Sequence, residues 1–272
     1  IAQCLVGSEM CIRDRAQTVF KNEEVEVSLL KEKTWVFSTW DYTTMYLIEG
    51  EDKAVLIDTG TRCADLDKIV GQITGKPLEV IVTHMHPDHA GCIKYFDKVW
   101  MHRADTVLVP QHAADYQGEF LYMEEGQVFD LGGRKLEVAW MPGHTPGSVV
   151  LLDKANGDCY SGDAFGSGEV WLQCVPMSPI ATFHESCCRM EKLMKEGHIK
   201  DIWCGHYPYL KSSLPLAYIQ TMIRISHRLM NGDQEGSEPY SNYFIKMPPT
   251  ARKLAEGRAM IVYDSTNIPE AR

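Results

Sequence analysis

The segment THMHPDHAG, residues 83–91, constrains this chain more than any other feature. Three histidines and an aspartate fall within six positions, directly after the apolar stretch LEVIV, which is typical of a buried strand. Side chains alternate along an extended segment, so His84 and His86 point the same way and both imidazoles can bind one ion. The proline that follows suits the start of a helix, whose first turn would direct Asp88 and His89 at a neighbouring ion. The motif therefore predicts a metal site at the end of a strand.

The ligand types in this motif suit several metals. Imidazole nitrogen and carboxylate oxygen bind zinc at about 2 Å, and iron and manganese accept much the same ligands. An alternative is that these histidines are solvated loop residues or part of a closed structural zinc site. Structural zinc sites usually use cysteine ligands, and the motif contains no cysteine. The motif therefore favours a reactive site that holds zinc, with iron or manganese as alternatives.

Charge and composition argue against several other classes of function. The formal net charge is −10, whereas proteins that bind nucleic-acid backbones use clustered Lys and Arg, so nucleic acid is not an expected partner. No apolar run reaches the roughly 20 residues that cross a bilayer, so no membrane partner is expected. Nine cysteines occur at irregular spacings without a CxxC pair, which favours free thiols in a reducing cytoplasm. A small-molecule substrate is expected, and assembly of identical chains is left open.

The rest of the chain alternates between strand-like and helix-like segments. The expected strands are VEVSLL, TWVFST, TTMYLIEG, AVLIDTG, LEVIVTH, KVWMH, QVFDL, KLEVAWM, SVVLLD, DCYSGD and IKDIWCGH. The expected helices are CADLDKIVGQI, the segment from His184 to Glu196, and LPLAYIQTMIRISHRLM. This alternation alone indicates a two-layer α/β protein.

Three regions of the chain are expected to differ in organisation. Residues 1–15 lack the basic and apolar segments of a secretory signal, and they resemble a translation of sequencing-adapter nucleotides, so an artefactual or disordered leader is expected. Residues 16–230 are expected to form one domain. The segment NGDQEGSEPY, residues 231–240, is rich in turn formers. Residues 231–272 are too few for an independent domain and are predicted to form a linker and a C-terminal cap or edge element of the same domain.

Four further segments occur in the order found in a known family. AVLIDTG (54–60) precedes the histidine motif, and PGHTPGS (142–148), YSGDAF (160–165) and WCGHYP (203–208) follow it. Together with the motif they resemble the metallo-β-lactamase superfamily over most of residues 25–230. Within that superfamily, the chain resembles the branch that includes glyoxalase II and the lactonases.

The resemblance implies a site with two metal ions, expected to be zinc. The first two histidines of the motif and His144 would hold one ion. Asp88, the last histidine of the motif and His206 would hold the other, while Asp163 would touch both ions and Asp58 would orient the ligands from behind. Seven ligands exceed the four that a closed tetrahedral site uses. The candidate ligands are His84, His86, Asp88, His89, His144, Asp163 and His206.

The resemblance also implies a fold and an activity. The family fold is an α/β structure, an αββα four-layer sandwich. Two metal ions lower the pKa of a shared water toward 7, so the implied activity is hydrolysis of an ester, thioester, lactone or related bond, with Asp88 moving a proton to the leaving group. Aromatic residues near the ligand segments are candidates for a substrate pocket, namely Phe165, Trp171 and Tyr207. Histidines outside the motifs are expected to be surface or packed residues, namely His102, His112, His184, His198 and His227.

Two alternative functions remain at this point. Persulfide dioxygenases share the fold and the histidine motif but hold one iron, whose ligands here would be His84, His144 and Asp163. The other alternative is a non-catalytic binding protein that retains its metals. Because no ligand position is substituted, the sequence favours the hydrolase.

Overall fold

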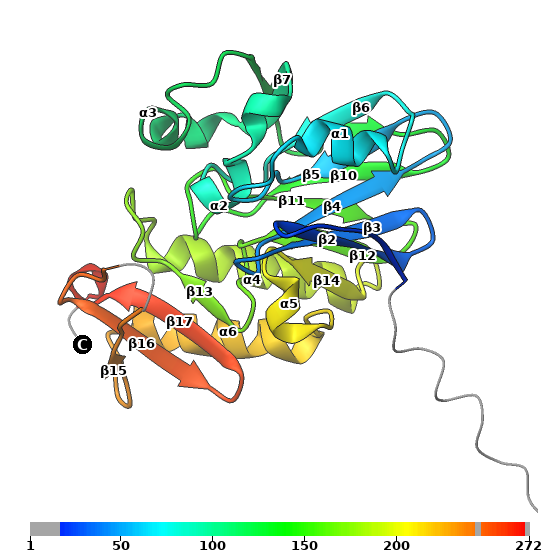
Figure 1. Ribbon diagram of the computed structural model, residues 1–272. Helices are drawn as coiled ribbons and strands as arrows, with labels where there is room; N and C mark the ends of the chain where they lie inside the picture. The colour runs from blue at the N-terminus through cyan, green and yellow to red at the C-terminus, as the bar shows by residue number, and fades with distance from the viewer. Residues whose placement is uncertain (1–16, 243–245, 270–272) are drawn as a thin grey trace, which may run out of the picture.

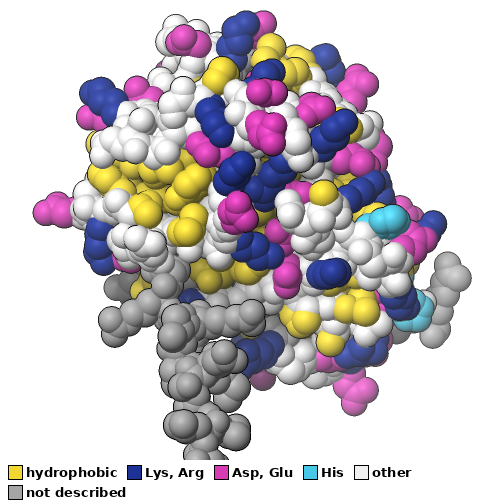
Figure 2. Space-filling view, turned by 90° about the vertical axis from the view of Figure 1, so that its right-hand side faces the viewer, with side chains coloured by type: hydrophobic (Ala, Val, Ile, Leu, Met, Phe, Trp, Pro, Cys, Tyr) yellow, Lys and Arg dark blue, Asp and Glu magenta, His cyan; other side chains and the backbone are white. Residues whose placement is uncertain are grey.

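Two mixed sheets lie face to face in this structure, with helices on their outer sides and a smaller third sheet beside them (Figure 1). The computed structural model describes residues 17–242 and 246–269, so the leader predicted at residues 1–15 lies outside the described residues. Basic and acidic side chains are interspersed over the face shown in Figure 2. Within the described residues, no helix is both long and apolar enough to cross a membrane.

The first sheet has eight strands in chain order, from β1 to β8. They are β1 (Thr18–Lys21), β2 (Val25–Lys31), β3 (Thr34–Thr39), β4 (Thr44–Glu49), β5 (Ala54–Ile57), β6 (Leu78–Ile81), β7 (Lys98–His102) and β8 (Glu119–Met123). Strands β1 to β5 pair antiparallel, whereas β5 to β8 pair parallel. Because β5 and β6 run parallel, the segments that follow them leave the sheet at the same edge. The predicted strands from β2 to β7 are confirmed, while β1 and β8, at the two edges of the sheet, were not predicted.

The second sheet has five strands in the order β14-β12-β11-β10-β9. They are β9 (Val128–Asp130), β10 (Lys135–Trp140), β11 (Val149–Asp153), β12 (Asp158–Gly162) and β14 (Asp201–Cys204). Strand β14 pairs parallel with β12, and the other neighbours pair antiparallel. The segments that follow β12 and β14 therefore emerge side by side.

Three clusters of buried apolar side chains fill the spaces between the layers. Along β4, Met45 and Leu47 pack toward helix α1, whereas Tyr46 and Ile48 pack between the two sheets. Strand β4 is almost entirely apolar because both of its faces are buried. The third cluster joins the second sheet to helices α4 and α6. The layers are thus helix, sheet, sheet and helix, which confirms the predicted αββα sandwich and replaces the two-layer interpretation from alternation alone.

Helices cover the outer faces of both sheets. They are α1 (Leu66–Gly71), α2 (Pro87–Ala90), α3 (Val109–His112), α4 (Ile180–Lys195), α5 (Tyr207–Leu210) and α6 (Leu216–Met230), with 3₁₀ helices η1 (Ile93–Tyr95), η2 (Arg103–Leu108) and η3 (Ser265–Asn267). Helix α4 begins four residues before the predicted start at His184. The His184 ring faces the Ser226 hydroxyl of α6 across 2.9 Å, so this histidine joins the two long helices.

The C-terminal residues form a third sheet with the order β13-β17-β16-β15. Its strands are β13 (Glu169–Trp171), β15 (Glu238–Pro239), β16 (Ala251–Glu256) and β17 (Ala259–Asp264). Ile261 and Tyr263 of β17 belong to the same buried cluster as α4 and α6. Strand β13 lies shortly after Asp163, so its parallel pairing with β17 ties the chain's end to the loop next to the candidate site. The predicted boundary between a domain of residues 16–230 and a linker with a C-terminal cap or edge element of residues 231–272 stays a prediction.

Candidate metal centre

All seven predicted ligands lie together at one edge of the sandwich. The histidine motif follows β6 of the first sheet, and His144 lies in the loop between β10 and β11 of the second sheet. Asp163 comes directly after β12, and His206 lies between β14 and α5. The side chains fall into two groups whose potential ligand atoms lie within 4.8 Å of one another in each group. We call them the three-histidine group (His84, His86 and His144) and the mixed group (Asp88, His89, Asp163 and His206).

The three-histidine group is compact. The distance from His86 Nδ1 to His144 Nε2 is 2.9 Å, and the ring centroids of His84 lie 4.9 Å from His86 and 4.8 Å from His144. Neighbouring rings meet nearly edge to face. His86 thus presents Nδ1 to this space and His144 presents Nε2. Three imidazoles in this arrangement match the protein ligands of a catalytic zinc site with an open position.

Asp163 links the two groups. Its Oδ2 atom lies 3.2 Å from His206 Nε2 and 4.0 Å from His144 Nε2, and its Oδ1 atom lies 3.6 Å from His89 Nε2. The Asp88 Oδ2 atom lies 3.5 Å from His206 Nε2. Gly205 permits this close packing, because a Cβ atom there would lie only 2.5 Å from Asp163 Oδ1 and from the His89 ring. Asp163 therefore lies between the two groups, within 4.0 Å of a histidine nitrogen of each.

Several buried polar atoms at this site have no hydrogen-bond partner. They are His84 Nε2, His89 Nε2 and Asp163 Oδ1. Leaving such atoms unpaired costs about 1–3 kcal/mol each, and cations held by the two groups would satisfy all three. Imidazole and carboxylate donors suit a divalent metal ion, so the residues present fit the metal that the sequence predicts.

The outer nitrogens of four of the five histidines contact hydrogen-bonding partners, which leaves their inner nitrogens for a metal. His144 Nδ1 donates to the carbonyl of Trp171 at 2.7 Å, and His206 Nδ1 donates to the carbonyl of Tyr42 at 3.3 Å. His84 Nδ1 lies 3.1 Å from the Thr83 hydroxyl. Sequence reasoning missed the Trp171 and Tyr42 contacts because a backbone carbonyl leaves no mark on residue identity.

Asp58 lies behind both groups and contacts His89 and Thr83. It follows β5 in the left-handed backbone region, with φ of 63°, and its side chain is almost fully buried. Its Oδ2 atom accepts hydrogen bonds from His89 Nδ1 at 2.8 Å and from the Thr83 hydroxyl at 2.9 Å, while Oδ1 accepts from the Thr83 amide at 2.7 Å. One carboxylate thus orients His89 directly and His84 through Thr83.

Burial keeps the three-histidine group neutral. It lowers the pKa of His84 well below the usual value, and neighbouring histidines lower it further. Burial and His144 lower the pKa of His86 to about 3, and burial also lowers the pKa of His144. Neutral imidazoles have free lone pairs, which metal binding requires.

In the mixed group, positively charged histidines instead lie beside negatively charged carboxylates. Burial lowers the pKa of His89 and His206, but Asp163 and Asp88 together outweigh burial and raise the pKa of both histidines well above the usual value. Burial would raise the pKa of Asp163, but His206 and His89 lower it well below the usual value. In the metal-free protein, His89 and His206 are therefore protonated, and their positive charges replace the charge that a metal ion would bring to this group.

The predicted pocket residues have different surroundings. Trp171 and Tyr207 are partly exposed beside the ligand loops, whereas Phe165 has no exposed surface and packs in the core shared with α4 and α6. Because Phe165 is fully buried, it lines no accessible pocket. His112, predicted as a surface or packed residue, lies with its ring centroid 5.9 Å from that of His86. Tyr42, which was not predicted, stacks on Tyr209 at 5.0 Å, and Tyr209 lies 6.0 Å from His206.

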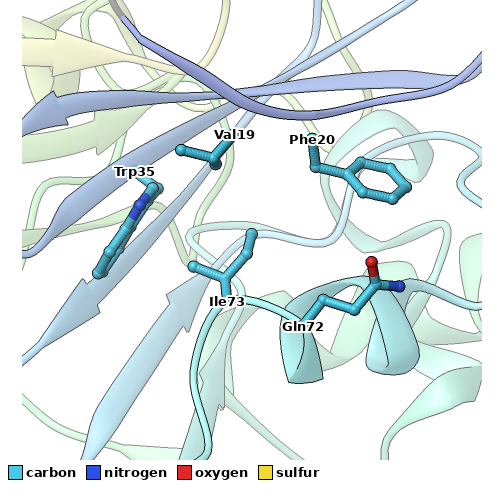
Figure 3. Close-up of a pocket in the computed structure, with 5 residues that line it drawn as sticks. All are labelled: Val19, Phe20, Trp35, Gln72 and Ile73. Atoms are coloured by element: carbon cyan, nitrogen blue, oxygen red, sulfur yellow. The ribbon is translucent and has the colours of Figure 1, made fainter.

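A hollow of about 280 Å³ lies away from these ligands (Figure 3). It is lined by Val19, Phe20, Trp35, Gln72 and Ile73, which come from β1, β3 and the end of α1. These side chains include no titratable or nucleophilic group. The hollow therefore lacks the groups that hydrolysis needs.

Known proteins resemble this chain in sequence. A family model described as metallo-beta-lactamase superfamily matches residues 38–184. The human acyl-coenzyme A thioesterase MBLAC2 is 25% identical over 210 residues, which cover 63% of this chain and 75% of the relative. A hydroxyacylglutathione hydrolase of Francisella philomiragia is 24% identical over 188 residues, which cover 67% of this chain and 72% of the relative.

Solved structures resemble the chain in fold. A metallo-beta-lactamase from Pontibacter korlensis matches with a TM-score of 0.60 and 17% identity, covering 75% of this chain and 99% of that one. The structure of TTHA1623 in a di-iron-bound form matches with a TM-score of 0.52 and 27% identity, covering 64% of this chain and 90% of that one. These similarities agree with the four-layer arrangement described above.

Proposed function

This chain belongs to the metallo-β-lactamase superfamily and is a metal-dependent hydrolase, and we propose that it cleaves thioester bonds of small molecules with two bound metal ions. The three-histidine group would hold one ion, and Asp88, His89 and His206 would hold the other, with Asp163 shared between them. Zinc is the proposed metal, with iron or manganese as alternatives. One relative is named an acyl-coenzyme A thioesterase and the other a hydrolase of hydroxyacylglutathione, and these names support the substrate class.

The observation that carries this proposal is the convergence of seven ligand side chains, three of which have a buried polar atom without a hydrogen-bond partner. When bound, two metal ions supply a water that ionises near neutral pH and a positive charge beside the carbonyl oxygen. The water oxygen would attack the carbonyl carbon, and the carbon–sulfur bond would break. A non-catalytic binding protein would not require this complete set of ligands.

Asp88 is placed to move the proton in this reaction. Its side chain is 34% exposed, against 14% for Asp163 and 2% for Asp58, so it is the carboxylate at this site that a substrate reaches most easily. Burial raises the pKa of Asp88, but His89 and His206 together outweigh burial, so the pKa falls below its usual value and the carboxylate is ionised at neutral pH. In this proposal the ionised carboxylate takes a proton from the attacking water and passes it to the departing sulfur.

Removal of the metal tests the proposal directly. Chelation is expected to abolish thioester hydrolysis, and two equivalents of Zn²⁺ per chain are expected to restore it. Metal analysis and turnover of acyl-coenzyme A and hydroxyacylglutathione thioesters, compared with matched oxygen esters and a lactone, would measure this. A single iron per chain with oxygen consumption would instead indicate the persulfide dioxygenase alternative, and full metal occupancy without turnover would indicate a binding protein.

Asp88→Asn is expected to slow hydrolysis by about 100-fold, the lower range for loss of acid–base catalysis. The loss should be larger for an oxygen ester than for the matched thioester, because an alkoxide needs a proton more than a thiolate, whose thiol has a pKa of about 8.5. The ratio of kcat/KM values for the two substrates measures this difference. Equal losses for both substrates would mean that Asp88 acts through metal binding alone.

The cellular setting is also part of the proposal. Five of the seven described cysteines are buried and all seven are free, namely Cys63, Cys92, Cys159, Cys174, Cys187, Cys188 and Cys204. Free thiols persist in reducing compartments, so we place the enzyme in the cytoplasm with a small-molecule substrate.

A further inference from the structure

Asp105 lies between two ligand loops and belongs to neither group of ligands. It is in η2, after β7, and its side chain is fully buried. Its Oδ2 atom accepts hydrogen bonds from the Met85 amide at 2.9 Å and from the Thr145 hydroxyl at 3.0 Å. Its Oδ1 atom accepts from the Gly147 amide at 2.6 Å. One carboxylate thus joins the loop after β6 of the first sheet to the loop after β10 of the second.

These contacts fall next to every member of the three-histidine group. Met85 separates His84 from His86, and Thr145 directly follows His144. The 2.9 Å distance between His86 Nδ1 and His144 Nε2 therefore spans two loops that Asp105 holds together. In the mixed group, His89 is instead held by Asp58, and Asp163 and His206 lie on other segments.

The loop around Asp105 is shaped to fit it. A Cβ atom on Gly147 would lie 2.6 Å from the Asp105 carboxyl carbon, so this position requires glycine for the amide to approach the carboxylate. Burial raises the pKa of Asp105 to about 6, although the bonds from Met85, Gly147 and Thr145 oppose this. At neutral pH the group is therefore ionised, and an ionised carboxylate accepts hydrogen bonds without donating any. All three of its partners donate.

We propose that Asp105 is a positioning residue that fixes the spacing between His86 and His144, and so sets the metal affinity of the three-histidine group without touching the ion. The inference rests on the two-ion site proposed above. Partners that orient metal ligands typically change metal affinity about 10- to 100-fold when removed. The effect should be confined to one of the two ions, because the mixed group is held by other contacts.

Titration of metal-free protein with Co²⁺ tests this. In Asp105→Ala, the affinity for one of the two ions is expected to fall about 10- to 100-fold, as for other outer partners of metal ligands. The hyperfine-shifted imidazole N–H signals identify which ion is weakened, because His144 donates to Trp171 whereas His206 donates to Tyr42. The His144 signal should weaken at Co²⁺ concentrations that still saturate His206. Thr106→Ala is the matched control, since that hydroxyl bonds only within η2, to Arg103.

Asp105→Asn keeps the shape of the side chain and one carbonyl oxygen, so its Co²⁺ affinity should fall less, and at the same ion. This variant replaces Asp105→Ala in the experiment if the alanine variant does not fold. Unchanged Co²⁺ affinities in a folded variant, or equal losses at both ions, would overturn the proposal. The Asp105 variant could lose the His144 signal selectively while the wild-type protein hydrolyses no thioester. That result would contradict the proposed function and would still support the role of Asp105.

Discussion

His86→Ala is expected to abolish hydrolysis while the protein keeps its fold. The substitution removes one of three imidazoles that would hold the first ion, and the positive charge beside the substrate carbonyl is lost with that ion. Loss of several kcal/mol of such stabilisation corresponds to a rate about 10⁴-fold lower. Because His86 is partly exposed at the start of α2 and supports no core contact, the thermal stability of the metal-free protein should change little. Steady-state kinetics and metal analysis of the same preparation would measure both effects.

His112→Ala is the matched control for this experiment. The His112 ring lies next to that of His86, but it belongs to neither group of ligands. The control should retain two metal ions per chain. Turnover of the His86 variant within tenfold of the wild type would contradict the assignment of the site.

Asp58→Ala is expected to destabilise the fold and weaken both metal sites. The substitution leaves the Thr83 amide, the Thr83 hydroxyl and His89 Nδ1 buried without their acceptor. At about 1–3 kcal/mol for each unsatisfied group, the free energy of unfolding should fall by about 3 kcal/mol or more. Because Asp58 orients His89 directly and His84 through Thr83, metal occupancy should fall in both groups. Denaturant unfolding of the metal-free protein and metal analysis test the two effects separately.

Asp65→Ala provides a control matched in residue type and backbone. Asp65 also lies in the left-handed region, with φ of 54°, but its side chain is exposed and pairs with Lys68 at the surface. Exposed ion pairs contribute little, so this variant should lose less than about 1 kcal/mol. A similar loss in both variants would mean that the left-handed backbone, and not the buried carboxylate, causes the effect at Asp58.

Much of the fold could be predicted from local patterns. Strands such as β3 and β7 coincide with their predicted segments because runs of β-branched and aromatic residues between polar turns mark them. Strands β13 and β15 were missed because they are short, and β16 because half of its residues are charged. Strand β17, AMIVYD, was missed although its composition is typical of a buried strand. The start of α4 was placed too late because the helix begins after Pro179 without a side-chain cap.

The sequence by itself determined the identity of the candidate ligands. A dense histidine motif and three short loop motifs can be recognised by their residues and their order along the chain, independently of the segments that separate them. The tertiary structure alone decided which nitrogen of each histidine faces inward and what holds the ligand loops in place. The carbonyl that orients His206 comes from Tyr42, 164 positions away, and Asp105 reaches Gly147 across 42 positions. Such contacts depend on how the two sheets pack, and no local pattern in a single sequence indicates a contact between residues so far apart in the chain.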